Sequence, residues 1–234
     1  MTEDGPRGRA NFRLIADQVR NRIATGSYPP SSRLPTEDEL AEEFDTNRGT
    51  AAQSLRLLVG LGLVTKSRRG TFVHRIVTKI TRDGVTRFAR SQLEEEQNPS
   101  AFDSQIRELG MTPTYVTETR HVQPPAWVAD LLKVDAHTES TLALRRRALA
   151  DDVPIELATS YRAELDHPQS TITEDIEIRT PTAEEIAALD MTEDQRVIEI
   201  IRIARAEDGR ALRVTIHILP SHLWRLSYSW RVGP

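Results

Sequence analysis

Residues 46–82 contain eight basic side chains and no acidic one, in a chain whose 35 Asp and Glu outnumber its 31 Lys and Arg. Lys and Arg gathered in this way can bind an anion such as a phosphate group. A block of like charge can also be only a solvated tail. Apolar residues recur through this stretch, however, which indicates folded structure. We therefore expect a folded basic surface that faces an anionic partner. The basic residues are Arg48, Arg56, Lys66, Arg68, Arg69, Arg75, Lys79 and Arg82.

The chain offers little for catalysis or metal binding. It has no cysteine, which excludes a thiolate nucleophile, a disulfide and a Cys-ligated metal. Its six histidines show neither the HxxxH nor the HExxH spacing of zinc sites. No pairing of a nucleophile with a base stands out either. We predict that the protein is not an enzyme and that it carries no cofactor and no metal.

Composition suggests a cytoplasmic protein of two units. No apolar run approaches the roughly 18 residues of a membrane span, and the first residues lack the apolar core of a signal peptide. We therefore expect no membrane partner. Residues 1–75 carry 12 Lys and Arg against 9 Asp and Glu, whereas the remaining residues carry 19 against 26. This asymmetry favours one unit that faces an anion such as nucleic acid.

The basic residues lie on a characteristic order of elements. Apolar residues at helical spacing predict a helix over residues 12–24. Thr36 and Glu39 form the pattern of a capping box, which predicts a second helix to about residue 44. A third helix is expected over 48–61 after a short turn. Strands over 63–66 and 71–73 would flank a basic tip at residues 67–70. This order predicts a winged helix-turn-helix, whose recognition helix and wing would face DNA phosphates.

Beyond residue 90 the apolar spacing approaches two, which is typical of strands. Strands are predicted over 114–122, 141–149, 154–163, 197–206 and 211–219, and short helices over 101–109, 127–132 and 182–189. Two of the predicted hairpins resemble each other at a shift of 57 residues, which superposes Asp151 on Asp208 and Arg145 on Arg202. The fold class is therefore α+β. Residues 1–75 are the helix-turn-helix domain, 76–90 a linker, and 91–234 a domain with an antiparallel sheet of two related halves.

Residues 12–73 resemble the N-terminal domain of the GntR family of bacterial transcriptional regulators. The segments YPP, RLPTEDELAEEF and GTFV carry this resemblance most specifically. The second domain is similar to the UTRA effector domain of the HutC-type branch, which has a chorismate-lyase-like fold, through RRALADDVPIELATSY and RIARAEDGRALRVTIHI. The resemblance implies a repressor that binds a palindromic double-stranded DNA operator as a homodimer. A small-molecule effector in the second domain would release the DNA.

The resemblance places DNA contacts at the cap of the second helix, the start of the third helix and the wing tip. Arg48 has no acidic residue four positions away and lies where the helix macrodipole disfavours a cation, so a DNA role is favoured over a structural one. For Gln53 and Lys66, a DNA contact and plain solvation are both open. The candidate DNA-binding residues are Thr36, Asn47, Arg48, Gly49, Thr50, Gln53, Lys66, Arg68, Arg69 and Gly70.

Two helix positions depart from the family pattern on the DNA side. Family members usually carry Arg where Asp38 and Ala52 stand, and the first of these Arg residues often reads a guanine. Asp38 can instead accept a hydrogen bond from a cytosine amino group, or cap its helix. The operator preference of the family therefore does not transfer to this chain.

Alternation along residues 211–219 places the apolar even-numbered residues on one face and the polar odd-numbered residues on the other. The polar face is either a wetted sheet surface or the wall of a ligand cavity, and the resemblance favours the cavity. The expected effector-binding residues are Arg146, Ser160, Arg213, Thr215 and His217.

The pocket also departs from the pattern of relatives that bind sugar phosphates. Ala148 stands where they carry Arg, and Ala158 and Arg213 stand where they carry Glu. A sugar-phosphate effector is therefore not transferred to this chain. The alternative interpretation is a repressor of the plasmid-transfer type that is independent of an effector or regulated by a partner, with a degenerate pocket.

Overall fold

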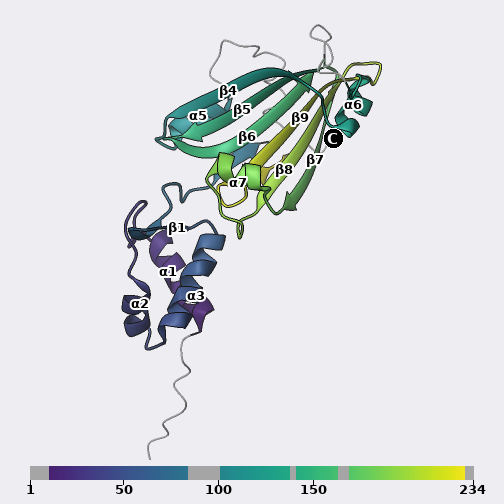
Figure 1. The fold of residues 1–234 in the computed structure, drawn as a ribbon. Coiled ribbons are helices and arrows are strands. Elements are labelled where there is room, and N and C mark those ends of the chain that lie inside the picture. Colours follow the sequence, from purple (N-terminus) through teal and green to yellow (C-terminus); the bar gives the residue numbers. More distant parts are fainter. Residues whose placement is uncertain (1–10, 84–100, 138–140, 163–168, 230–234) are drawn as a thin grey trace, which may run out of the picture. The chain divides into compact units, whose positions relative to one another are not determined.

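The computed structural model describes residues 11–83, 101–137, 141–162 and 169–229, with no side-chain description at residues 101 and 102. These residues belong to two compact units, whose boundary lies between Lys79 and Ile80 (Figure 1). No helix within these ranges is long and apolar enough to cross a membrane.

Three helices and a hairpin make up the first unit. They are α1 (Phe12–Ala24), α2 (Glu37–Glu43), α3 (Arg48–Gly60), β1 (Val64–Ser67) and β2 (Gly70–Val73). Each helix begins at a polar residue whose side chain accepts hydrogen bonds from backbone N–H groups, which would otherwise lack partners. The apolar stripes of the helices meet β1 and β2 in one core. This core contains Ile15, Ala16, Val19, Ile23, Leu34, Leu40, Ala51, Leu55, Leu58, Val64 and Val73.

The capping box at the start of α2 is confirmed. The Thr36 hydroxyl accepts from the Glu39 backbone N–H at 3.2 Å, and the Glu39 carboxylate accepts from the Thr36 backbone N–H at 2.7 Å. Ser67 pairs with Gly70 in the hairpin, so Arg68 and Arg69 form its two-residue tip. The winged helix-turn-helix predicted for this part of the chain is therefore the observed architecture.

A six-stranded antiparallel sheet dominates the second unit, in the order β4-β5-β6-β9-β8-β7. Its strands are β4 (Pro113–Val122), β5 (Thr141–Ala150), β6 (Val153–Arg162), β7 (Thr171–Arg179), β8 (Val197–Arg205) and β9 (Ala211–Pro220). The order reads as two three-stranded meanders that meet where β6 pairs with β9. This arrangement agrees with the two related halves expected from the sequence, and the fold class α+β is confirmed.

Short helices cover one face of this sheet. α6 (Ala126–Leu132) joins the first two strands of one half, and α7 (Ala183–Leu189) joins the first two strands of the other. α6 packs on Val214 of β9, and α7 packs on Ile218 of the same strand. Because side chains alternate along a strand, Arg213, Thr215 and His217 point to the opposite face. A further helix, α5 (Ala101–Glu108), precedes β4.

Three strands were not predicted. β3 (Ile80–Asp83) lies within the expected linker, where it pairs in parallel with β10 (Trp224–Ser227), near the other end of the chain. Ile80 and Arg82 are fully buried there, which accounts for strand structure where a linker was expected. Residues 84–90 of that expected linker lie outside the described residues. In β7 the apolar alternation is interrupted by Glu174, which weakens the strand signal. The other predicted elements agree with the observed bounds to within one residue.

Candidate nucleic-acid interface and ligand pocket

The first turn of α3 carries four of the predicted DNA-binding residues, and two of them also form its cap. Asn47 Oδ1 accepts from the Thr50 backbone N–H at 2.9 Å and lies 3.3 Å from the Thr50 hydroxyl. A Cβ added at Gly49 would lie 3.1 Å from the same Asn47 oxygen. The absence of a side chain at Gly49 thus leaves room for the cap. Asn47, Gly49 and Thr50 therefore have a structural function, whichever contacts they make with DNA.

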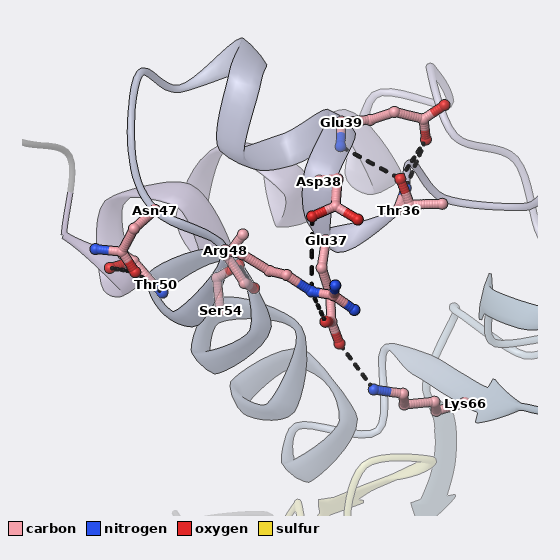
Figure 2. Close-up of polar contacts among 10 residues, drawn as sticks. Thr36, Glu37, Asp38, Glu39, Asn47, Arg48, Thr50, Ser54 and Lys66 are labelled. Atoms are coloured by element: carbon pink, nitrogen blue, oxygen red, sulfur yellow. Dashed lines mark hydrogen bonds and ion pairs between the residues drawn. The ribbon is translucent and has the colours of Figure 1, made fainter.

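Arg48 projects from α3 towards the first turn of α2 (Figure 2). Its Nε lies 3.1 Å from Glu37 Oε2 and 3.6 Å from Asp38 Oδ1. The other Glu37 oxygen lies 3.0 Å from Lys66 Nζ on the wing strand β1. Arg48 has no acidic residue four positions away on its own helix, but it has two acidic partners on α2. Sequence reasoning also missed Glu37, because no local spacing relates it to Arg48 or Lys66.

The charges around Glu37 keep its carboxyl group ionised. The hydrogen bond from Lys66, and then that from Arg48, lower the pKa of Glu37 below its usual range. The hydrogen bond to Glu37, followed by the charge of Asp38, raises the pKa of Arg48. The arrangement is thus a cation–anion–cation bridge between the third helix and the wing at neutral pH.

The arginines at the wing tip differ from Arg48 and Lys66, which form ion pairs with Glu37. Arg68 and Arg69 are exposed, and neither forms an ion pair with any residue in the described ranges. Gln53 is also exposed, on the turn of α3 that follows Arg48. Arg33, which sequence reasoning did not single out, lies beside the wing and lines a hollow of about 340 Å³ together with Arg48 and Lys66. This surface can neutralise several phosphates of a duplex.

Gly70 occupies a backbone conformation that other residues rarely adopt, with φ at +130°, and an added Cβ would lie 3.1 Å from Arg33 Nε. We expect Gly70→Ala to lower the free energy of unfolding of the first unit by about 1–3 kcal/mol. Thermal unfolding followed by circular dichroism measures this change. Arg69→Ala is the matched control at the exposed tip, and its effect should stay within about 0.5 kcal/mol. Equal stability of the two variants would contradict the prediction.

The five residues expected to bind an effector line one cavity of about 250 Å³ in the second unit. The strand register explains why they meet, since Ser160 on β6 lies opposite Thr215 on β9. Their hydroxyl oxygens are 3.0 Å apart. Arg146 enters from β5, where its guanidinium lies 5.0 Å from the centre of the Tyr115 ring. The cavity lies on the sheet face opposite to α6 and α7.

Two further arginines line the cavity, and sequence reasoning missed both. Arg162 is two residues beyond Ser160 on the same face of β6, and Arg202 lies on β8 opposite Thr215. Alternation along β6 could have identified Arg162, because residues two apart share a face. The described lining thus carries four arginines and no carboxylate. Such a cavity favours a compact anion.

His217 is a buried polar residue in the cavity wall. Its Nδ1 lies 2.6 Å from Glu156 Oε1, and both side chains are almost completely buried. Burial lowers the pKa of His217 to about 4, which outweighs the opposing effect of Glu156. The imidazole is therefore neutral at pH 7, and an ionised Glu156 would accept a hydrogen bond from a proton on Nδ1. Its buried Nε2 has no hydrogen-bond partner among the described residues and could accept from a ligand.

Behind Arg202 lies a buried ionic cluster. Glu174 on β7 accepts from Arg202 Nε at 2.9 Å, from Arg82 and, at 3.2 Å, from the Tyr228 hydroxyl. Arg82 is the last basic residue of the acid-free stretch, and its side chain has no exposed surface. The interpretation of that stretch as a DNA-facing surface therefore does not extend to Arg82, which neutralises a buried carboxylate.

Comparisons with known proteins connect these features to a family. The model of bacterial regulatory proteins of the gntR family matches residues 13–73. The HTH-type transcriptional repressor NagR of Bacillus subtilis is 29% identical, over 63% of this chain and 55% of NagR, so the chain spans just over half the length of this relative. The HTH-type transcriptional regulator SCO4628 of Streptomyces coelicolor is 24% identical, and the match covers 94% of this chain and 93% of SCO4628. PhnF from Mycobacterium smegmatis shares the fold with a TM-score of 0.51, at 18% identity, over 94% of this chain and 100% of its own.

Proposed function

We propose that this chain, whose residues 13–73 form a helix-turn-helix domain of the gntR family of transcriptional regulators, represses transcription by binding a palindromic double-stranded operator as a homodimer. The observation that carries the proposal is the exposed pair Arg68 and Arg69 at the wing tip. They precede Gly70, which lines the same hollow as Arg48 at the start of the capped helix α3. The resemblance of the chain to NagR, a repressor, supports the same function. The protein acts by binding and not by catalysis.

The second unit is proposed to be a UTRA-like effector domain. Its cavity carries arginines from four strands, and the neutral His217 adds a hydrogen-bond acceptor at Nε2. These groups fit a small anion, such as a carboxylate or phosphate compound, that also carries a hydroxyl group. The proposed dimer would have one state that binds DNA and one that does not. An effector releases DNA only to the extent that it binds the second state more tightly than the first.

The first experiment measures binding of the purified chain to the DNA upstream of its own coding sequence, by fluorescence anisotropy. Titrations are repeated at several salt concentrations, with and without a panel of small hydroxylated anions. Tight binding that one anion abolishes would support both parts of the proposal. Binding that no anion changes would favour the alternative repressor with a degenerate pocket, in line with Ala148 and Ala158. A folded chain that binds no duplex at any salt concentration would refute the DNA-binding function.

The wing tip supplies a quantitative prediction. The slope of log K against log salt concentration should become less steep by about 1.8 in the double variant Arg68→Ala, Arg69→Ala. Each lost phosphate contact accounts for about 0.9 of this change. Arg120 and Arg210 are two separate exposed arginines of the second unit. The control double variant Arg120→Ala, Arg210→Ala should leave the slope unchanged. An unchanged slope in the wing variant would place the phosphate contacts elsewhere.

A further inference from the structure

Glu37 lies between two cations of the candidate DNA-binding surface. Its two oxygens lie 3.1 Å from Arg48 Nε and 3.0 Å from Lys66 Nζ (Figure 2). The Glu37 side chain is only 21% exposed, whereas those of Arg48 and Lys66 are 67% and 56% exposed. The anion is therefore held by its surroundings, and the two cations lie where a duplex can reach them.

A DNA phosphate would bind these cations in the same way, because its oxygens also accept from guanidinium and ammonium groups. We propose that Glu37 is an internal competitor for DNA phosphates. It occupies Arg48 and Lys66 in the free protein and thereby weakens binding to DNA of any sequence. This inference rests on the proposed DNA-binding function and deepens it, since it identifies a residue that sets how strongly non-operator DNA is bound.

The local structure indicates that Glu37 is not needed to stabilise the fold, which favours its role as a competitor for cations. The capping box of Thr36 and Glu39 satisfies the start of α2 without the Glu37 side chain. Asp38 and Glu39 also remain in the first turn, so the helix keeps favourable acids there. Ion pairs with such exposed cations contribute little to stability. The expected consequence of Glu37 therefore lies in binding and not in folding.

The arrangement divides four cations of the candidate DNA-binding surface into two groups. Arg68 and Arg69 at the wing tip have no carboxylate partner within the described chain and are available to phosphates at once. Arg48 and Lys66 must first leave Glu37, or share it. On DNA that lacks the operator sequence, this competition lowers affinity, because phosphate neutralisation supplies essentially all sequence-independent binding.

The test compares the full chain with its Glu37→Gln variant on a duplex of random sequence, by fluorescence anisotropy between about 50 and 200 mM salt. Glutamine keeps the shape of the side chain and removes its charge. We expect the variant to bind about three- to tenfold more tightly at the lowest salt concentration, with a slope of log K against log salt steeper by about one. Glu42→Gln removes the same charge from an exposed position on α2 and is the matched control, with an expected change below about twofold.

Two outcomes would overturn the inference while leaving DNA binding intact. Weaker binding by Glu37→Gln would show that Glu37 positions its two cations for DNA. Equal gains in Glu37→Gln and Glu42→Gln would show only a general effect of net charge. If the folded wild-type chain shows no salt-dependent binding to the duplex, the proposed function fails and the inference fails with it.

A second variant protects the test against a folding defect. Glu37→Asp keeps the charge but shortens the side chain, so that it no longer spans both cations. It should show a smaller gain in affinity than Glu37→Gln, and circular dichroism verifies that each variant is folded. A gain with Asp as large as with Gln would also contradict the inference, because the charge would then not be the competing group.

Discussion

Replacing Glu174 by Gln is expected to lower the free energy of unfolding of the second unit by about 3–5 kcal/mol. Glu174 is the carboxylate shared by Arg82 and Arg202, and its side chain is only 4% exposed. Burial alone would raise the pKa of Glu174, but the charges of Arg82 and Arg202 together lower it. A neutral glutamine would leave two positive charges close together in the interior without their counter-charge.

Tryptophan fluorescence makes this prediction measurable in the intact chain. The first unit contains no tryptophan, since all three tryptophans of the sequence follow residue 79, so their emission during chemical denaturation does not report on the first unit. The described tryptophans Trp127 and Trp224 both lie in the second unit. Glu184→Gln is the control, because Glu184 pairs with Arg145 at the surface and is 70% exposed. Its effect should not exceed about 1 kcal/mol.

The electrostatic account of this loss has a test of its own. Arg82→Met removes one of the two cations, so adding it to Glu174→Gln should restore part of the lost stability. If the double variant is no more stable than Glu174→Gln alone, repulsion between uncompensated charges does not explain the loss.

Acidification from pH 6.5 to pH 4 is expected to destabilise the second unit by about 3 kcal/mol through His217. The folded pKa of His217 is lowered to about 4 by burial, with smaller contributions from Arg82 and Arg202 that Glu156 opposes. In the unfolded chain the same imidazole titrates near 6.5. Between these values the unfolded state binds more protons than the folded state. Stability is therefore complete above pH 6.5 and is lost as the pH falls towards 4.

The measurement follows the denaturation midpoint from tryptophan emission at several pH values. His217→Gln should remove most of the dependence on pH between 6.5 and 4, because no imidazole remains to be protonated on unfolding. His121→Gln is the control, since His121 is exposed on β4. If the denaturation midpoint of His217→Gln depends on pH as strongly as that of the wild type, the loss of stability in acid arises from carboxyl groups and not from His217.

The predictable part of the candidate site depends on local patterns. Thr36 and Glu39 stand at the spacing of a capping box, and that contact forms within one helical turn. Alternation along β9 was enough to place Arg213, Thr215 and His217 on a common face, since neighbouring side chains in a strand point to opposite sides. The cavity that these residues line was therefore accessible to sequence reasoning in outline.

Glu156 and Glu37, which sequence reasoning missed, meet their partners across separate elements. Glu156 contacts His217 because β6 lies beside β9 in the sheet. Glu37 reaches Arg48 and Lys66 only after α2, α3 and the wing have packed together. Neither contact follows a helical or strand spacing, so no window of sequence contains its signal.

The amino-acid sequence by itself determined the elements of the helix-turn-helix, the antiparallel hairpins and the polar face of β9, because helical periodicity, caps and alternation act over a few residues. Only the tertiary structure decided that Arg82 turns inward to Glu174, through the parallel pairing of β3 with β10 from the far end of the chain. The tertiary structure likewise decided that Glu37 bridges two cations of the candidate DNA-binding surface. The physical reason is the same in both cases. The partner of a charged side chain is set by distance in space, and packing brings together residues whose separation along the chain leaves no periodic trace.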